Sequence, residues 1–171
     1  MRRRLLTTLA IAAALSACGP KAKTADASPG ASGANAAAAK AFMAKNATAA
    51  GVHVTASGLQ YKIVRSGPAD GLRPQEGDLI KVHYEGKLLD GKVFDSSYER
   101  GVPAVLPLEG LIPGWIEALQ LMRPGDEWVL YVPPALGYGT EDKGAIPPNS
   151  ALIFRIELIA IQPGPGRVGQ G

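Results

Sequence analysis

Alternating apolar and polar residues recur along the C-terminal two-thirds of the chain and predict β-strands. Ile80, Val82 and Tyr84 alternate with polar neighbours, so this strand should have one core face and one solvent face. Residues 59–63 repeat the pattern, and every second residue from Leu152 to Leu158 is apolar in a final long strand. Residues 127–132 are mostly apolar on both faces, which is typical of a central strand.

A hairpin and one helix complete this region. Residues 90–91, Asp-Gly, predict a two-residue hairpin turn, because both turn positions favour a positive φ. The helix should begin at Pro113, where the missing N–H costs nothing, bury Trp115 and Leu119, and end before residues 124–125, Pro-Gly. One short helix packed on several antiparallel strands predicts an α+β fold over residues 56–161.

The N-terminal residues resemble an export signal. Residues 1–4 are positively charged and residues 5–17 form an apolar run that is too short to span a bilayer as a helix. The run ends in Leu-Ser-Ala-Cys-Gly, residues 15–19, which resembles the bacterial lipobox. The resemblance implies a signal peptide over residues 1–17 and a lipidated Cys18, the one cysteine of the chain.

The segments on either side of the domain are poor in large apolar residues. Residues 18–36 are rich in Ala, Gly, Ser, Pro and Lys, which predicts a flexible tether. The Ala-rich residues 36–50 predict a short helix within a lead-in of residues 37–55. This helix could pack on the domain, fray or pair with a second copy, and the sequence does not decide among these. Residues 162–171 predict a disordered tail.

Composition and charge narrow the function. Nine of the ten aromatic residues lie between Tyr61 and Phe154, which places the core there. Three of the 18 basic residues lie in the first seventeen positions, which hold no acidic residue, so a processed chain has fifteen basic and fifteen acidic side chains. No basic stripe remains, which excludes a nucleic-acid-binding function.

Residues for covalent or metal chemistry are scarce. The sequence has no nucleophile elbow, no phosphate-binding loop and no metal-ligand spacing of His and Cys. The G-x-G-x-x-G run at residues 164–169 has no helix after it, so it does not predict a dinucleotide site. His53 and His83 are the two histidines, and His83 falls on the solvent face of its strand. Neither a metal nor a cofactor is expected.

Six tracts identify a family resemblance. They are Val82-His83-Tyr84-Glu85-Gly86, Val93-Phe94-Asp95-Ser96-Ser97, Leu111-Ile112-Pro113-Gly114-Trp115, Gly137-Tyr138-Gly139, Ile146-Pro147-Pro148-Asn149-Ser150 and Leu152-Ile153-Phe154. In this order they resemble the FKBP-type peptidyl-prolyl isomerases over roughly residues 55–161. The residues just before them are similar to the macrophage-infectivity-potentiator branch of bacterial lipoproteins.

The resemblance implies an antiparallel sheet half-wrapped around one short helix, with a pocket between them. Carried over to this chain, it implies catalytic roles for Tyr84, Phe94, Asp95, Trp115, Tyr138 and Phe154, and substrate-binding roles for Arg100, Leu111, Ile112 and Ile146. Trp115 would form the floor, and the Tyr138 hydroxyl and the Ile112 N–H would each hold a substrate carbonyl. Ile146 would lie on a loop that overhangs the pocket.

The implied activity is cis/trans isomerisation of X–Pro bonds in unfolded or partly folded exported proteins. Macrolide inhibitors are implied ligands, although Ala104 and Leu106 stand where the family often has larger aromatic residues. The implied location is the cell envelope, facing the periplasm and lipid-anchored to a membrane. The outer membrane is favoured, although the sequence does not decide between the inner and the outer membrane. A membrane-tethered holdase with low turnover and a structural lipoprotein with a vestigial pocket are alternatives. The sequence leaves open whether the chain is a monomer or a weak dimer.

Overall fold

A computed structural model describes residues 29–165 of this chain. Its helices and strands are, in chain order, α1 (Pro29–Asn46), β1 (Val52–Val54), β2 (Gln60–Arg65), β3 (Leu79–Leu88), β4 (Val93–Ser96), β5 (Ala104–Pro107), α2 (Pro113–Leu121), β6 (Glu127–Val132), a 3-10 turn over Pro134–Leu136, and β7 (Leu152–Gln162). The signal peptide and lipidated Cys18 expected from the sequence lie outside the described residues. Within residues 29–165, no helix has the length and hydropathy needed to cross a membrane.

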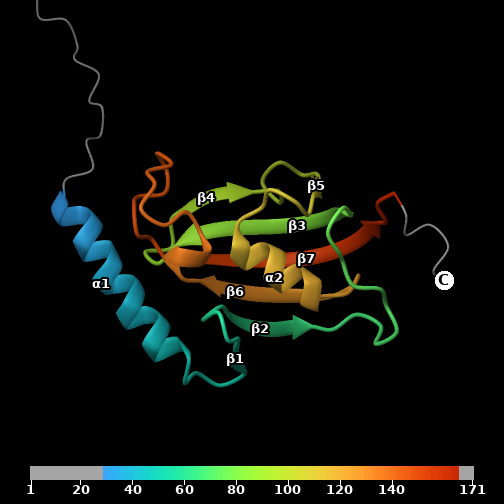
Figure 1. Ribbon diagram of the computed structural model, residues 1–171, viewed down its shortest axis with the longest axis horizontal. Helices are drawn as coiled ribbons and strands as arrows, with labels where there is room; N and C mark the ends of the chain where they lie inside the picture. Colours follow the sequence, from blue (N-terminus) through green and yellow to red (C-terminus); the bar gives the residue numbers. More distant parts are fainter. Residues whose placement is uncertain (1–28, 166–171) are drawn as a thin grey trace, which may run out of the picture.

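The seven strands form one antiparallel sheet in the order β1-β2-β6-β7-β3-β4, with β5 also paired to β3. The long strands β3 and β7 pair along their whole length, from Leu79 opposite Gln162 to Leu88 opposite Leu152. Helix α2 lies across one face of this sheet (Figure 1). The predicted α+β fold, with an antiparallel sheet around one short helix, is therefore confirmed.

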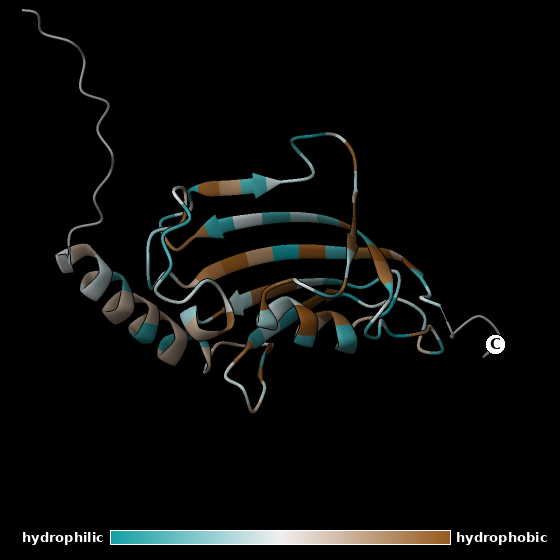
Figure 2. Ribbon diagram, turned by 45° about the horizontal axis from the view of Figure 1, so that its top comes forward, coloured by the Kyte–Doolittle hydropathy of each residue, from teal (hydrophilic) through white to brown (hydrophobic). Residues whose placement is uncertain are grey.

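Alternation along the strands decides which face meets the helix. Ile80 and Val82 on β3 and Ile156 and Leu158 on β7 are fully buried. Figure 2 shows the matching alternation of hydrophobic and hydrophilic residues along the strands. The N-terminal turn of α2 begins as predicted, with Pro113 at its start. Burial of these apolar faces, at about 25 cal/mol per Å² of area removed from water, is the main force that holds helix and sheet together.

Helix α1 is longer than predicted, and the lead-in differs from the expected one. It begins at Pro29 within the predicted tether, and the lead-in also contains strand β1. The helix packs on the domain: Ala39 is buried, the Phe42 ring lies 5.9 Å from the Tyr131 ring, and the Gln60 side-chain amide donates to the Met43 carbonyl. These contacts with the domain offset the ordering entropy that the composition alone leaves uncompensated.

The structure differs from two smaller predictions. The hairpin loop between β3 and β4 has three residues rather than two, because Leu88 and Lys92 form a backbone hydrogen bond and only Gly91 has a positive φ. A type I turn followed by a left-handed glycine suits this loop length. The first residues of the predicted tail contact the domain, because Gln162 pairs in β7 and the Gly164 N–H donates to the buried Asp78 carboxylate. Residues 166–171 of that tail lie outside the described residues.

Candidate functional site

A pocket of about 130 Å³ lies between the sheet and the N-terminal turn of α2. Side chains from β3, β4, β5, α2, β7 and two loops meet there, and they are those of Tyr84, Phe94, Asp95, Leu106, Leu111, Ile112, Trp115, Tyr138 and Phe154. The structure thus brings together eight of the ten residues that the resemblance implied. Arg100 and Ile146 are not among the lining residues.

The rings of the pocket meet edge to face. The Trp115 ring lies 5.1 Å from the Tyr84 ring at 83° and 5.2 Å from the Phe154 ring at 84°. The Phe94 ring meets the Phe154 ring at 5.6 Å and 86°. Such contacts suit the positive edge and negative face of aromatic rings, and they hold the side chains in fixed orientations. The floor and walls are therefore rigid and apolar.

The backbone before α2 sets the position of Trp115. Ile112 is extended, with φ −61° and ψ 145°, and its carbonyl accepts hydrogen bonds from the N–H groups of Trp115 and Ile116. Pro113 has the fixed φ that the first helical turn requires. Trp115 therefore leaves the first turn of the helix toward the sheet. Its indole N–H is buried and donates to no other described residue.

Gly86 is a further residue of this site, for which the family resemblance implied no role. A Cβ atom at this position would lie 2.6 Å from the Phe94 ring and 2.7 Å from the Phe154 ring. No real side chain tolerates such contacts, so the two rings occupy the space that any other residue would fill. A glycine inside an alternating strand was the available signal, because it often marks a close approach.

The mouth of the pocket is polar. The Tyr84 hydroxyl donates to Asp95, and the Arg100 guanidinium donates to Asp95 and, at 3.0 Å, to the Tyr84 oxygen. The Arg100 cation also lies 5.5 Å from the centre of the Tyr84 ring. Arg100 contacts two lining residues from outside and orients them.

This network raises the pKa of Tyr84 and lowers the pKa of Asp95. Burial, followed by the hydrogen bond to Asp95, raises the pKa of the Tyr84 phenol above its ordinary value. Burial alone would also raise the pKa of Asp95, but hydrogen bonds from Tyr84 and Arg100 outweigh it and lower that pKa. Tyr84 therefore stays protonated and Asp95 stays charged throughout the neutral range.

Tyr138 and Ile146 lie on the segments around the 139–150 loop. Tyr138 follows the 3-10 turn, is half-buried, and has the Lys143 ammonium 5.7 Å from its ring centre. Ile146 is buried in the same hydrophobic core as Trp115 and Phe154 but is not a lining residue. Its place on a loop that overhangs the pocket stays a prediction. Leu106 of β5 also lines the pocket, at a position where the family often has a larger aromatic residue.

Both histidines lie away from the pocket. The His83 ring stacks on Tyr98 at 4.7 Å, and its Nδ1 lies 2.9 Å from the Ser97 hydroxyl. The His53 ring stacks on Tyr61 at 5.0 Å. The residues that line the pocket therefore include one carboxylate, one phenol at the mouth and one phenol at the rim, with no nucleophile or base near neutrality.

Comparison with known proteins gives two family matches. Residues 71–159 match the family described as FKBP-type peptidyl-prolyl cis-trans isomerase. Residues 2–63 match the domain described as amino terminal to FKBP-type peptidyl-prolyl isomerase. Together the two matches cover nearly all of the chain apart from its C-terminus.

Individual relatives agree with these matches. The chain is 48% identical over 129 residues to the peptidyl-prolyl cis-trans isomerase Mip of Coxiella burnetii, a match over 75% of this chain and 55% of that protein. It is 46% identical over 123 residues to the outer membrane protein MIP of Legionella longbeachae, over 71% of this chain and 52% of that one. The crystal structure of FkpA from Escherichia coli superimposes with a TM-score of 0.74 at 41% identity, over 78% of this chain and 62% of that one. The chain thus spans just over half the length of the curated relatives it matches.

Proposed function

Because this chain belongs to the FKBP-type peptidyl-prolyl cis-trans isomerase family, we propose that it catalyses the cis/trans isomerisation of X–Pro bonds in unfolded or partly folded polypeptides. The observation that carries the proposal is the aromatic pocket around Trp115, which has the size and apolar lining for a proline ring. The catalytic domain of the family covers the strands and the helix that build this pocket.

The reaction needs no nucleophile. Rotation about an X–Pro bond breaks amide resonance against a barrier of about 18–20 kcal/mol, and unaided it takes tens to hundreds of seconds. No bond to another atom forms, so a site can accelerate rotation by binding the twisted amide better than the planar one. The twisted amide has lost charge separation, and a dry aromatic wall therefore favours it over the planar form.

Each residue has a role in this scheme. Trp115 receives the proline ring from below, and Tyr84, Phe94 and Phe154 enclose it. Leu111 and Ile112 form the rim, where the Ile112 N–H holds a substrate carbonyl. The Tyr138 hydroxyl donates to a second carbonyl beside the rotating bond, and Asp95 with Arg100 keeps the Tyr84 phenol in place at the mouth.

A refolding assay tests the activity. The protein should accelerate the slow, proline-limited refolding phase of a small substrate protein and the isomerisation of a blocked tetrapeptide with one X–Pro bond. A ligand that competes for the pocket should inhibit both. A holdase would instead bind the unfolded chain and suppress its aggregation with no acceleration of either reaction, and that result would overturn the proposal.

We further propose that the chain is a lipoprotein of the outer membrane, anchored through Cys18 and facing exported proteins. The lipobox-like residues 15–19 support this proposal, as does the similarity to the outer membrane protein MIP of Legionella longbeachae. Cys18→Ser should move the protein from the membrane fraction to the soluble or unprocessed fraction, because acylation requires the thiol. Membrane retention of a fully cleaved Cys18→Ser protein would exclude the anchor.

A further inference from the structure

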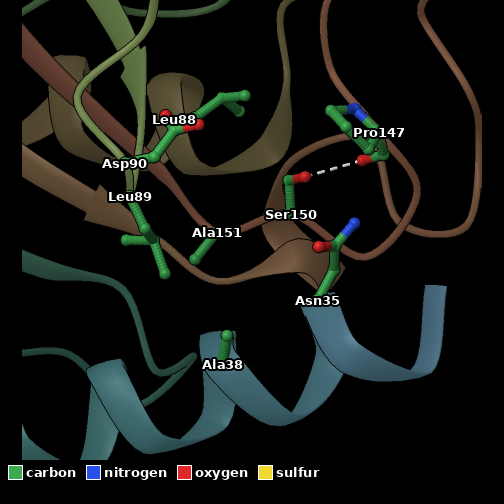
Figure 3. A pocket seen from close by; sticks show the side chains of 8 residues that line it. All are labelled: Asn35, Ala38, Leu88, Leu89, Asp90, Pro147, Ser150 and Ala151. Atoms are coloured by element: carbon green, nitrogen blue, oxygen red, sulfur yellow. Dashed lines mark hydrogen bonds between the residues drawn. The ribbon is translucent and has the colours of Figure 1, made fainter. Parts of the chain in front are cut away.

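A second cavity, of about 260 Å³, lies between α1 and the end of the sheet. Figure 3 shows Ala38 and Asn35 on α1 facing Ala151 and Ser150 on the opposite wall, with Leu89 beside them. Leu88 and Pro147 complete the apolar part of the lining. The cavity exists only where α1 meets the domain, so the domain without its helix would lack one wall.

The polar groups that hold this cavity together are paired with one another. The Asn35 amide donates to the Pro148 carbonyl at 3.0 Å, and the Asn149 amide donates to the Ser32 hydroxyl at 2.7 Å. The Ser150 hydroxyl donates to the Pro147 carbonyl at 2.7 Å. What the walls present to an occupant is therefore mainly hydrocarbon, with the exposed Asp90 carboxylate at the edge.

This cavity lies further along the same two strands that form a wall of the isomerase pocket. Gly86 pairs with Phe154 at the wall of the pocket, and two residues further along, Leu88 pairs with Leu152 beside the cavity. Two residues of strand correspond to about 7 Å, so an extended polypeptide would cover the distance in two to four residues. A chain held by its proline ring in the pocket can thus reach the cavity.

We infer that the cavity beside Ala38 is a subsite for a large apolar side chain of the client polypeptide, a few residues from the proline. The inference rests on the proposed isomerase function and assigns that site a preference beyond the X–Pro pair. Its occupant is an unfolded chain, because such chains expose Leu, Phe and similar residues near their prolines. The segment before α1 suits the cavity poorly, since residues 19–28 contain no large apolar side chain.

Peptide kinetics with two matched variants test the subsite. The probes are a blocked tetrapeptide with alanine on either side of its one X–Pro bond, which offers the cavity no large apolar side chain, and longer peptides that carry one Phe at successive distances from a single X–Pro bond. Ala38→Phe fills the cavity from the exposed surface of α1. Ala37→Phe adds the same ring about 100° further round that helix, at an exposed position that does not line the cavity.

In the wild-type protein, Phe at one distance should raise kcat/KM about fivefold over Ala at that position. Ala38→Phe should abolish this gain, whereas Ala37→Phe should keep it, and all three proteins should isomerise the tetrapeptide at the same rate. The subsite is excluded if no distance gives a gain or if Ala38→Phe retains it. A change of self-association in Ala38→Phe alone would assign the cavity to a second copy of this chain and also overturn the inference.

Peptide binding separates this proposal from the isomerase itself. If no peptide is turned over, titration of the long peptides into the wild-type protein and Ala38→Phe still reports on the cavity. A Phe-dependent affinity that Ala38→Phe abolishes would support the subsite while the isomerase proposal fails. An affinity without dependence on Phe would refute the subsite.

Discussion

The two faces of the sheet differ in the side chains that they carry. On the face toward α2, the rings of Tyr84 and Phe154 meet the Trp115 ring of the helix edge to face. The other face holds a charged cluster in which Arg155 donates to Glu127 at 2.6 Å and Arg65 donates to Glu157 at 2.6 Å. Because successive residues of a strand point to opposite faces, both arrangements come from the same strands.

The difference between the two faces explains why the walls of the pocket are apolar in a chain with many charges. Arg155 and Glu157 alternate with Phe154 and Ile156 along β7, so the charges lie on the face away from the pocket. His83 on β3 also lies on that face, beside Tyr98. Substitutions on the aromatic face should therefore affect turnover, whereas substitutions on the charged face should affect stability alone.

Trp115→Ala should have the largest effect. It should reduce turnover and stability together, because this ring belongs both to the core and to the pocket. Removal of a large, 5% exposed aromatic side chain should cost about 3–5 kcal/mol of unfolding free energy. Turnover of the tetrapeptide should fall with it by more than about tenfold. Chemical denaturation and peptide kinetics on the same preparation measure both. Full activity in a destabilised variant would exclude Trp115 from the site.

Tyr138→Phe should reduce activity and leave stability unchanged. Only a hydroxyl at a half-buried rim is lost, so the unfolding free energy should stay within about 0.5 kcal/mol of wild type. A lost hydrogen bond to the substrate corresponds to a decrease of about three- to tenfold in kcat/KM. The same assays apply, and a large loss of stability with unchanged kinetics would assign Tyr138 to the core.

Glu127→Gln should reduce stability and leave turnover unchanged. Its carboxylate is largely buried and accepts from Arg155, whose side chain is half-exposed, so the loss should be about 1 kcal/mol of unfolding free energy. The difference from wild type should shrink as salt is added, because salt screens the remaining charges. Tetrapeptide turnover should not change. A decrease in kcat/KM at constant stability would show that the two faces are coupled.

The smallest expected effect is that of pH on turnover. The lowered pKa of Asp95 and the raised pKa of Tyr84 leave no group at the pocket that titrates between about pH 5.5 and 8.5. In this window kcat/KM for a non-titrating peptide should stay constant within about twofold. A bell or a step in the profile would reveal acid–base catalysis, and His53→Gln and His83→Gln would identify the group.

Acid should affect stability instead. A carboxylate whose folded-state pKa lies below its unfolded value stabilises the fold above that unfolded value, near 4. The contribution is lost as the pH falls through the folded-state pKa. Because Asp95 and Arg100 are both about half-exposed, this loss should be small. Asp95→Asn should therefore show a weaker dependence of stability on pH below 5 than the wild-type protein.

The strands, the helix α2 and most of the lining residues could be predicted from the sequence. Burial of one face leaves a two-residue period in β3 and β7, and Pro113 marks where α2 begins. The pocket itself came from the family resemblance, because periodicity does not distinguish the wall residue Phe154 from the core residue Ile156. Both lie on the same face of the same strand.

The rest depended on contacts that no local pattern records. Helix α1 gains its order from residues that follow it by more than a hundred positions, such as Pro148 and Asn149. Its alanines give little amphipathic contrast, as the pale helix in Figure 2 shows, so its docked face could not be identified beforehand. The role of Gly86 depends on two rings from other strands.

The pairing of β3 with β7 also determines when the pocket becomes complete as the chain folds. The last strand of the sheet lies between β3 and β6 and supplies Phe154 to the pocket, and β3 is made well before it, ahead of β4, β5, α2 and β6. Pairing across such a long stretch of sequence is slow compared with local helix formation. A chain that emerges from its N-terminal end, as an exported chain does when it crosses a membrane, therefore has no complete pocket until β7 has emerged and inserted, so the proline-limited steps in its own folding before that point proceed without its help.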